Sequence, residues 1–499
     1  MTPPTGRRLG WRLVVTVVLV YAIHFATDVV RETYLAVALG DHLSVRVDEY
    51  AGLHPDLFEI TGRGVFINNN PGASLLGAVP YAIARPGMTL LFRWKPALVA
   101  PKPAATYDDP RPNRTKFMNA ARAQGVDIKL GLAAASMHIG LMVPLAALAT
   151  LVMFRFLSAR LDDERLALWF SLLYAFGTPI FFRSAFLNQN VIVAHAILFA
   201  YVWLVGLTAR RTENTIGTRT LLGAGVMLGV ALLADYSAVP LLLAFGAWSM
   251  ARGWRSGGRS EAVRSGGWLV LGGLGPVLLL LGYQWVAFGS PFLPAQAYMP
   301  STQLSTHGWY GFVPPQPALL WDNLFDLRFG LFAFCPMLVA AVAAPWVRQR
   351  LGGPTAWELG LIFTATLALY LFNSSVEFAR LQWNTGIRYM VPAVPLLFIA
   401  LVPVLLKLPR WLALSLVVPT VFISWSVAMV RESVPVALTH VLGGGLELPW
   451  LTVLQKTAAA YAPRLAQGAS PVPIFLVVGL MLWLLWRPRS LRGTSPAAQ

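Results

Sequence analysis

The sequence predicts an all-α polytopic membrane protein with about twelve transmembrane helices. Two features support this fold class, the composition and the position of the charges. Of 499 residues, 56% are hydrophobic and 12% are charged, whereas soluble domains average about 25% charged residues. The 39 Lys and Arg residues lie mostly between apolar segments, as membrane orientation requires. The net charge of +17 therefore does not indicate a nucleic-acid partner.

The apolar segments are long enough, or almost long enough, to cross the roughly 30 Å hydrocarbon core of a bilayer. The first follows three arginines, as in a signal peptide, but no small-x-small cleavage site comes after it, so we interpret it as an uncleaved span. The polar sequence Asp235-Tyr236-Ser237 divides the least certain pair. The predicted spans are 11–30, 130–156, 166–185, 190–209, 220–234, 237–251, 267–287, 329–347, 357–373, 389–406, 411–430 and 471–486.

The charges that flank these segments predict the orientation of the chain. With the N-terminus inside, the inward segments hold 20 Lys and Arg residues and the short outward segments hold 6. Cytoplasmic segments are the ones enriched in positive charge, so both termini are predicted to be cytoplasmic. We interpret residues 1–499 as a single transmembrane domain with three large outer loops, which are 31–129, 288–328 and 431–470.

The first outer loop, 31–129, is too apolar to be a flexible linker. Apolar residues at helical spacing between Tyr34 and Leu43 predict a helix that lies along the membrane interface. Residues 73–93 are apolar enough to span, but Pro80 and Pro86 interrupt them. We therefore expect a second interfacial helix in this segment.

Asp48 and Glu49 are the candidates for a general base. They follow the first span by about 18 residues, on the outward side, at the end of the expected interfacial helix. Asp41 lies seven residues before Asp48, on the same face if the helix continues that far. The alternative is that these carboxylates are solvated surface groups, which is the commoner role of an acidic pair in a loop.

Arg388 is the candidate for a cation that binds phosphate. It lies in the sequence RLQWNTGIRYMVPAVP, at the outer entrance of the tenth predicted span, with Trp383 before it and Tyr389 after it. A guanidinium offers a fixed fork of donors that suits phosphate oxygens. The alternative is an arginine that anchors the end of the helix at the membrane surface.

A second polar group marks the outer turn between the third and fourth predicted spans. Polar residues there are costly unless they face a water-filled cavity or a partner. The histidines within spans, His138 and His195, are more often structural than ligands, and Cys335 has no cysteine partner. No metal site is predicted, no cofactor is required, and a divalent cation finds no support. The polar group comprises Arg183, Asn188, Gln189, Asn190 and His195.

The ordered landmarks resemble the GT-C superfamily of polyprenyl-phosphate-dependent glycosyltransferases, in particular its bacterial dolichyl-phosphate-mannose-mannosyltransferase-like (RgtA/B/C/D-like) branch. The pieces occur in the expected order between residues 30 and 400, and none is specific alone. The chain departs from the branch at Asn70, Asn190 and Ile387, where Pro, His and Pro are common. The matching pieces are RVDEY, FINNNPGASLLGAVPYAI, LLYAFGTPIFFRSAF, GYQWVAFGSPFLPAQAY, RFGLFAFCP and WNTGIRYMVPAVP.

This resemblance implies a hexosyl- or pentosyltransferase in the bacterial inner membrane, with interfacial helices of the first loop over its active site. It implies a polyprenyl-phosphate-sugar donor and a lipid, glycan or protein acceptor at the periplasmic face. The first-loop acid, Asp48 or a neighbour, is then the general base, and Arg388, Tyr389 and Arg183 contact the donor phosphate. The expected substrate pocket includes Asn69, Asn70, Asn190, His195 and Trp383.

Two other classes remain open from the sequence. A transporter or flippase of lipid-linked glycans also suits twelve spans, but carriers place functional ions near the middle of the bilayer, and the candidates here lie at the outer ends of spans. An O-antigen-type polymerase or ligase uses similar donors but has its large outer loop late in the chain. A non-catalytic paralogue is a further alternative.

Overall fold

The computed structural model describes residues 5–103, 107, 112–207, 216–347, 353–384, 386–461 and 470–487. These residues form helices almost throughout, with one two-stranded sheet in the described part, which confirms the all-α fold class. Within it, the helical stretches long and apolar enough to cross a membrane number five, or six if the bent pair Val434–Gly444 and Pro449–Thr457 is one span. They are Gly72–Trp94, Asp127–Leu161, Tyr236–Phe288, Ala356–Ser374 and Arg410–Val430.

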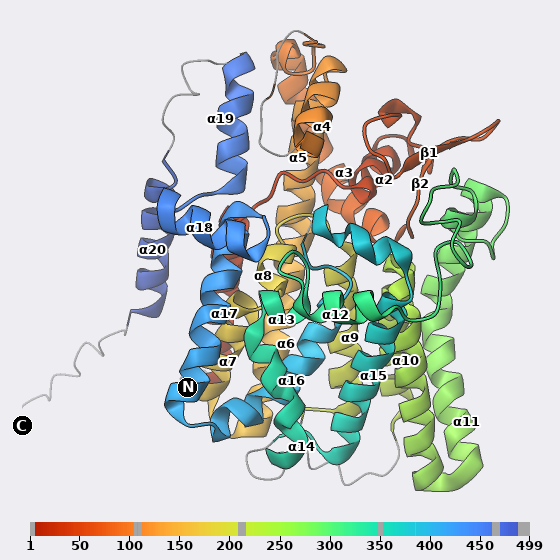
Figure 1. The fold of residues 1–499 in the computed structure, drawn as a ribbon, viewed down its shortest axis with the longest axis vertical. Helices are drawn as coiled ribbons and strands as arrows, with labels where there is room; N and C mark the ends of the chain where they lie inside the picture. The colour runs from red at the N-terminus through yellow and green to blue at the C-terminus, as the bar shows by residue number, and fades with distance from the viewer. Residues whose placement is uncertain are drawn as a thin grey trace, which may run out of the picture.

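Shorter apolar helices lie beside these candidates, so the chain is a multi-pass membrane protein, while the total of twelve spans stays a prediction. The helices stand side by side in a bundle (Figure 1). Two of them, α9 (Gln189–Val205) and α16 (Val394–Lys407), are buried along most of their length because nearly all of their residues are apolar. Around them lie α5 (Asp127–Met137), α6 (Val143–Leu161), α7 (Glu164–Gly177), α10 (Thr218–Ala234), α11 (Val239–Phe288), α15 (Ala356–Ser374) and α17 (Arg410–Val430).

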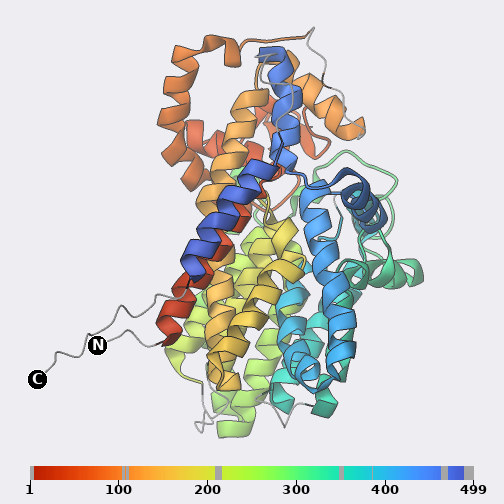
Figure 2. The ribbon, with the colours of Figure 1, turned by 90° about the vertical axis from the view of Figure 1, so that its left-hand side faces the viewer.

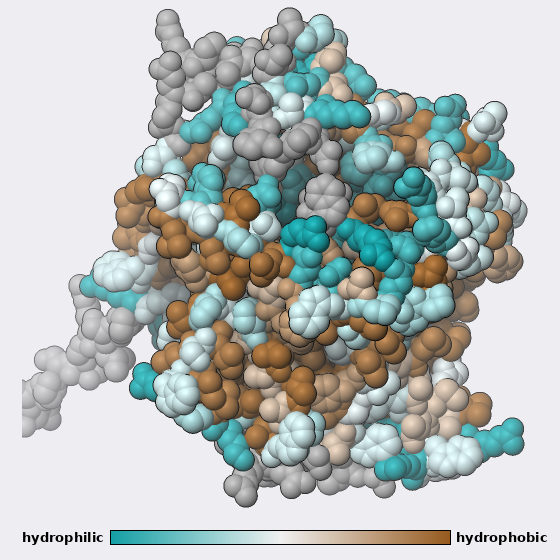
Figure 3. Space-filling view, viewed as in Figure 1, coloured by the Kyte–Doolittle hydropathy of each residue, from teal (hydrophilic) through white to brown (hydrophobic). Residues whose placement is uncertain are grey.

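The upper end of the molecule in Figure 1 is a cap of shorter elements. The predicted first outer loop supplies most of it, and its expected first helix is present as α2 (Arg31–His42). Figure 3 shows hydrophilic residues gathered in the upper half and a mainly hydrophobic band below them. The other cap elements are β1 (Leu57–Ile60), β2 (Gly64–Ile67), α3 (Gly72–Trp94), α4 (Pro112–Ala123) and α19 (Pro449–Tyr461).

The first and last helices pack against each other at the side of the bundle. These helices, α1 (Thr5–Ile23) and α20 (Val472–Trp486), lie side by side in Figure 2. The Trp486 indole donates to the Thr16 hydroxyl at 2.9 Å. The Arg12 guanidinium, in the first half of α1, donates to the carbonyl of Arg487, which directly follows α20, at 3.5 Å. The described chain therefore begins and ends toward the same end of the bundle.

One segment differs from its expected local structure, and a second has the expected helical form. The short inner loop expected at 252–266 is helical except at Gly257 and Gly258, where the chain turns back and α11 becomes two packed arms. Gly258 has φ +68°, a left-handed conformation that glycine adopts at little cost. The segment 73–93 is one continuous helix, α3, although Pro80 and Pro86 lie inside it. It meets the length and composition of a span, so its interfacial position stays a prediction.

The contact between α10 and the second arm of α11 predicts a stability effect. A Cβ added at Gly225 would collide with the backbone carbonyl of Leu269, so Gly225→Ala requires the two helices to separate. We expect a loss of about 1–3 kcal/mol of unfolding free energy. The matched control is Gly246→Ala, at a helical glycine with open space around it, which should be neutral or stabilise by up to about 1 kcal/mol. Unfolding in detergent measures both, and equal stabilities would contradict this packing.

Candidate active site

The start of α2 and the chain around the β-hairpin form the first part of the site. Arg31 pairs with Asp56 at 2.5 Å and with Glu32 at 3.1 Å. The side-chain amides of Asn68 and Asn69 donate to the same carboxylates, Asn68 to Asp56 at 3.0 Å and Asn69 to Glu32 at 2.7 Å. Each carboxylate is thus shared between a guanidinium and an amide, which fixes its position.

The hairpin explains why these residues meet. Strand β1 pairs antiparallel with β2 from Leu57 opposite Ile67 to Ile60 opposite Gly64. The turn between the strands uses two glycines with positive φ, Gly62 and Gly64, as tight turns favour. The backbone N–H of Asn68 then donates to the Asp56 carbonyl at 3.1 Å. The hairpin therefore returns the chain, and with it the two amides, to the residues that precede β1.

Asp56 lies in a strongly cationic environment. Burial raises the pKa of this carboxyl, but the charges of Arg31 and His54, with a contribution from Arg388, outweigh burial and lower the pKa to about 2. Burial is also the main reason that the pKa of His54 is lowered. At neutral pH Asp56 is therefore a carboxylate and His54 is uncharged.

The second part of the site surrounds the end of the first helix. Asp28 pairs with Arg431 at 2.9 Å and with Arg114 at 3.2 Å. The charges of Arg431 and Asp28 also act on Arg183, the last residue of α8 (Ile180–Arg183). The ring centroid of Phe186 lies 4.7 Å from the Arg431 guanidinium and 5.1 Å from the Arg183 guanidinium. Cation–π contacts offset part of the repulsion between two arginines on one ring.

Arg388 joins the two parts. Its charge acts on Asp56 and His54 in the first part and on Arg183 in the second. Its Nη2 donates to the Tyr389 hydroxyl at 2.8 Å. Its Nε–H is buried and has no hydrogen-bond partner among the described residues. A buried donor without a partner is costly, and in a cationic site it indicates a place for an anion.

These groups together are called the arginine–carboxylate cluster below. Among the described residues, these contacts join five guanidiniums and three carboxylates, so guanidiniums outnumber carboxylates within this group. A site with surplus guanidinium groups and a fixed geometry suits a phosphate. The cluster comprises Asp28, Arg31, Glu32, Asp56, Arg114, Arg183, Arg388 and Arg431.

The three acids predicted as a general base pair with residues outside the arginine–carboxylate cluster. Asp48 is 44% exposed, pairs with Arg46 at 2.6 Å and accepts the Val65 N–H at 2.7 Å. Glu49 is 56% exposed and contacts His42 at 3.2 Å. Asp41 binds Lys129 at 2.8 Å and Arg85 at 3.0 Å. Because α2 ends at His42 and Leu43 is left-handed, with φ 53°, Asp41 and Asp48 do not share a helix face.

The predicted pocket residues are divided in the structure. Asn69 belongs to the cluster through Glu32, whereas the amide of Asn70 donates to the Leu232 carbonyl at 2.7 Å. Asn190 and His195 are fully buried in α9, and their side-chain polar atoms have no partner among the described residues. The side chain of Trp383 lies outside the described part of the chain. The predicted cations Arg183 and Arg388, with Tyr389 beside Arg388, are brought together.

The sequence did not predict six residues of the cluster, which are Asp28, Arg31, Glu32, Asp56, Arg114 and Arg431. A signal for the first three exists, because Asp28, Arg31 and Glu32 follow the first span almost at once, where charges are costly without partners. Asp56 and Arg431 have no such local signal. Their role depends on the hairpin and on the end of α17, which bring them to the cluster from distant parts of the chain.

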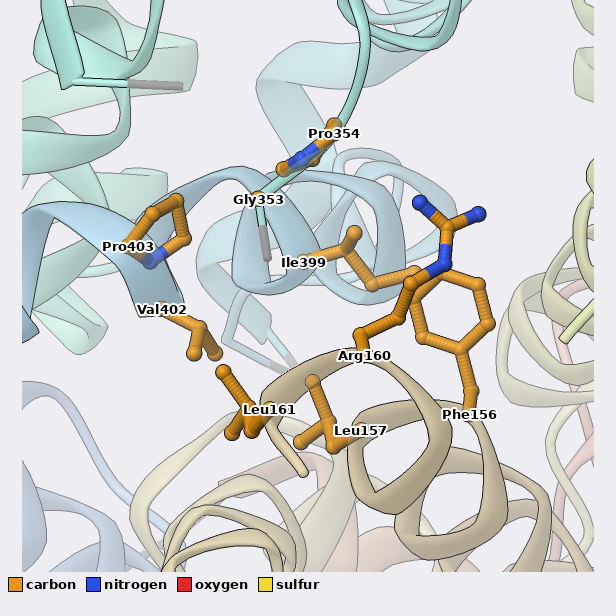
Figure 4. Close-up of a pocket in the computed structure, with 9 residues that line it drawn as sticks. All are labelled: Phe156, Leu157, Arg160, Leu161, Gly353, Pro354, Ile399, Val402 and Pro403. Atoms are coloured by element: carbon orange, nitrogen blue, oxygen red, sulfur yellow. The ribbon is translucent and has the colours of Figure 1, made fainter. Parts of the chain in front are cut away.

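No group of three His, Cys, Asp or Glu residues among the described residues is arranged to hold a metal ion. A small, mainly apolar pocket lies toward the opposite end of the bundle from the cluster, near the end of α6, with Arg160 at its edge (Figure 4). Arg160 pairs there with Glu358 at 2.7 Å. This buried pair links α6 to the start of α15 and leaves no surplus charge, so the pocket is not a second phosphate site.

Comparisons with known proteins give one structural similarity. The chain is similar to the crystal structure of ArnT from Cupriavidus metallidurans bound to undecaprenyl phosphate, at 13% sequence identity and a TM-score of 0.48. The match covers 96% of this chain and 75% of that chain. No family model and no curated protein matches the chain. The function proposed below is therefore drawn from the residues of this chain.

The electrostatics of Asp56 predict a pH-dependent stability. Its pKa of about 2 lies below the ordinary value of 3.8, so the ionised carboxylate stabilises the folded protein above about pH 4. That contribution is lost as the pH falls toward 2. Asp56→Asn should therefore cost about 1–2 kcal/mol at pH 7, a value reduced for water screening because the side chain is 30% exposed. The difference from the wild type should shrink between about pH 4 and pH 2.

Asp48→Asn is the matched control, since it removes an exposed carboxylate of the same loop. Its effect at pH 7 should stay within about 0.5 kcal/mol. Chemical unfolding in detergent at several pH values measures all three proteins. An Asp56→Asn variant as stable as the wild type at pH 7 would show that Arg31 does not stabilise this carboxylate.

Proposed function

We propose that the protein is a membrane glycosyltransferase of the GT-C type, which moves a sugar from a polyprenyl-phosphate donor to an acceptor at the periplasmic face of the bacterial inner membrane. The observation that supports this most is the arginine–carboxylate cluster, with its excess of guanidinium groups. The cluster lies at the hydrophilic end of an apolar bundle. A polyprenyl phosphate can place its phosphate in water there while its polyprenyl tail stays in the lipid.

The arginines stabilise the leaving phosphate group. As the bond between the anomeric carbon and the phosphate oxygen breaks, negative charge grows on the phosphate. Fixed donors that face this oxygen stabilise the transition state more than the ground state. Arg388 has the buried unpaired Nε–H for this task, and Arg183 and Arg31 lie within electrostatic range of it or of its neighbour Tyr389.

A carboxylate takes the proton of the acceptor hydroxyl as that oxygen attacks the anomeric carbon, with inversion as the expectation. Asp56 is a weak base in the free protein because its pKa is held at about 2. The Asp28 side chain is 36% exposed and pairs with Arg431, in the same cluster as Arg388. We therefore assign the base to Asp28, with Asp48 as the alternative from the sequence. The chemistry in this scheme requires no metal.

Transfer by the purified protein tests the assignment. In detergent, with a panel of short-chain polyprenyl-phosphate sugars, Arg388→Ala should lower kcat/KM by about 100-fold or more, because a donor to the leaving group is lost. Arg388→Lys should recover only part of the rate, since an ammonium has no planar fork. The control is Arg380→Ala, an arginine of the same segment that pairs with Glu377 and should keep near wild-type activity.

The same assay separates the acids. Asp28→Asn should lower kcat by roughly 100-fold or more with little change in donor affinity, and Asp48→Asn should stay active. Loss of transfer in Asp48→Asn alone would return the base to Asp48. Full activity in folded Arg388→Ala would refute the proposed function at this site.

A further inference from the structure

The backbone at Arg388 and Tyr389 is held by buried side-chain amides instead of by a helix or a sheet. It follows Gly386, whose φ is +71°. The side-chain oxygen of Gln382 accepts both backbone N–H groups, that of Arg388 at 3.2 Å and that of Tyr389 at 3.0 Å. The Asn373 amide donates to the Tyr389 carbonyl at 2.9 Å. One amide therefore binds each side of Tyr389.

These amides are themselves fixed. Gln382 is only 1% exposed, and its Nε2 donates to Asn323 Oδ1 at 3.0 Å. Asn323, in α12 (Pro317–Phe325), is fully buried and donates to the Ser374 hydroxyl at 3.3 Å. Ser374 ends α15 and donates back to the Tyr370 carbonyl at 2.8 Å. The chain of bonds thus runs from two helices to the segment that presents the guanidinium.

We propose that Gln382 is a positioning residue that sets where Arg388 meets the donor phosphate. This inference rests on the proposed function and adds a residue that no charge or motif marks. Among the described residues, Gln382 makes no hydrogen bond to the carboxylates of the cluster, and its side-chain oxygen accepts from two backbone donors. Its effect on a phosphate must therefore pass through Arg388 and Tyr389.

Phosphate binding by Arg388 should be sensitive to small displacements of its backbone. An arginine selected for bidentate binding loses much of its effect when it moves by about 1 Å. Gln382→Ala removes the common acceptor of two buried N–H groups, so the segment must shift to find new partners. Gln382→Met also removes this acceptor, but it fills a similar volume and adds no charge next to Arg388. The two variants therefore remove the same bonds to the Arg388 segment and differ in the cavity that they leave.

The first measurement is binding of a short-chain polyprenyl phosphate, without sugar, to the full-length protein in detergent. Gln382→Ala and Gln382→Met should each weaken it by roughly tenfold. The matched control is Gln284→Ala, which removes a buried glutamine bonded to the Tyr236 hydroxyl and should leave binding unchanged. Gln382→Met decides the matter if the alanine variant fails to fold, since binding as tight as that of the wild type would overturn the inference.

A double-mutant cycle separates positioning from a general structural role. In an Arg388→Ala background, Gln382→Ala should have almost no further effect on binding, because the group that it positions is absent. An undiminished tenfold effect there, or no effect in the wild-type background, would overturn this inference. If Arg388→Ala binds as well as the wild type, the phosphate site itself is wrong, and the proposed function fails with it.

Discussion

The guanidinium groups of Arg183, Arg388 and Arg431 act on one another at the hydrophilic end of an apolar bundle. Bringing like charges together in a partly buried place is unfavourable unless negative groups compensate them. Asp28 compensates part of this charge and Asp56 another part, and the Phe186 ring contacts the guanidiniums of Arg183 and Arg431. Among the described residues of the cluster, guanidiniums outnumber carboxylates, which suits an anionic ligand.

The fold serves this cluster by joining parts that are distant in sequence. The first loop contributes its carboxylates through α2 and the β-hairpin, and α8 and the end of α17 contribute arginines from the bundle. Arg388 comes from a segment held by the buried amides of Gln382 and Asn373, and Gln382 is in turn bonded to Asn323 of α12. The bundle below is tightly packed, with α9 and α16 almost fully buried. A rigid support of this kind is what an electrostatic site needs in order to remain fixed during reaction.

The sequence predicted the helical membrane fold because apolar segments and flanking charges are direct consequences of a bilayer. It also placed Arg183 and Arg388 at one membrane face, and the structure brings them together. The acids were harder to predict. Asp48 was chosen from its distance along the chain, and its role as the base stays a prediction. The structure adds Asp56, which the hairpin brings within electrostatic range of Arg388.

Local sequence cannot give such pairings, since they depend on where a turn sends the chain. Local sequence also failed to predict the structure of the loop expected at 252–266, between the predicted spans 237–251 and 267–287. Its charges are those of an inner loop, but Gly257 and Gly258 alone form the turn and the flanking residues stay helical. Gln382 also could not be predicted from the sequence, because its importance depends on the two backbone N–H groups that it binds in the fold.

The position of the lipid phosphate in a structure of the protein with a short-chain polyprenyl phosphate tests this account most directly. We expect a phosphate oxygen within about 3 Å of a guanidinium nitrogen of Arg388, on the side that faces Arg183. A phosphate bound away from the arginine–carboxylate cluster, for example beside Arg160 at the other end of the bundle, would contradict it.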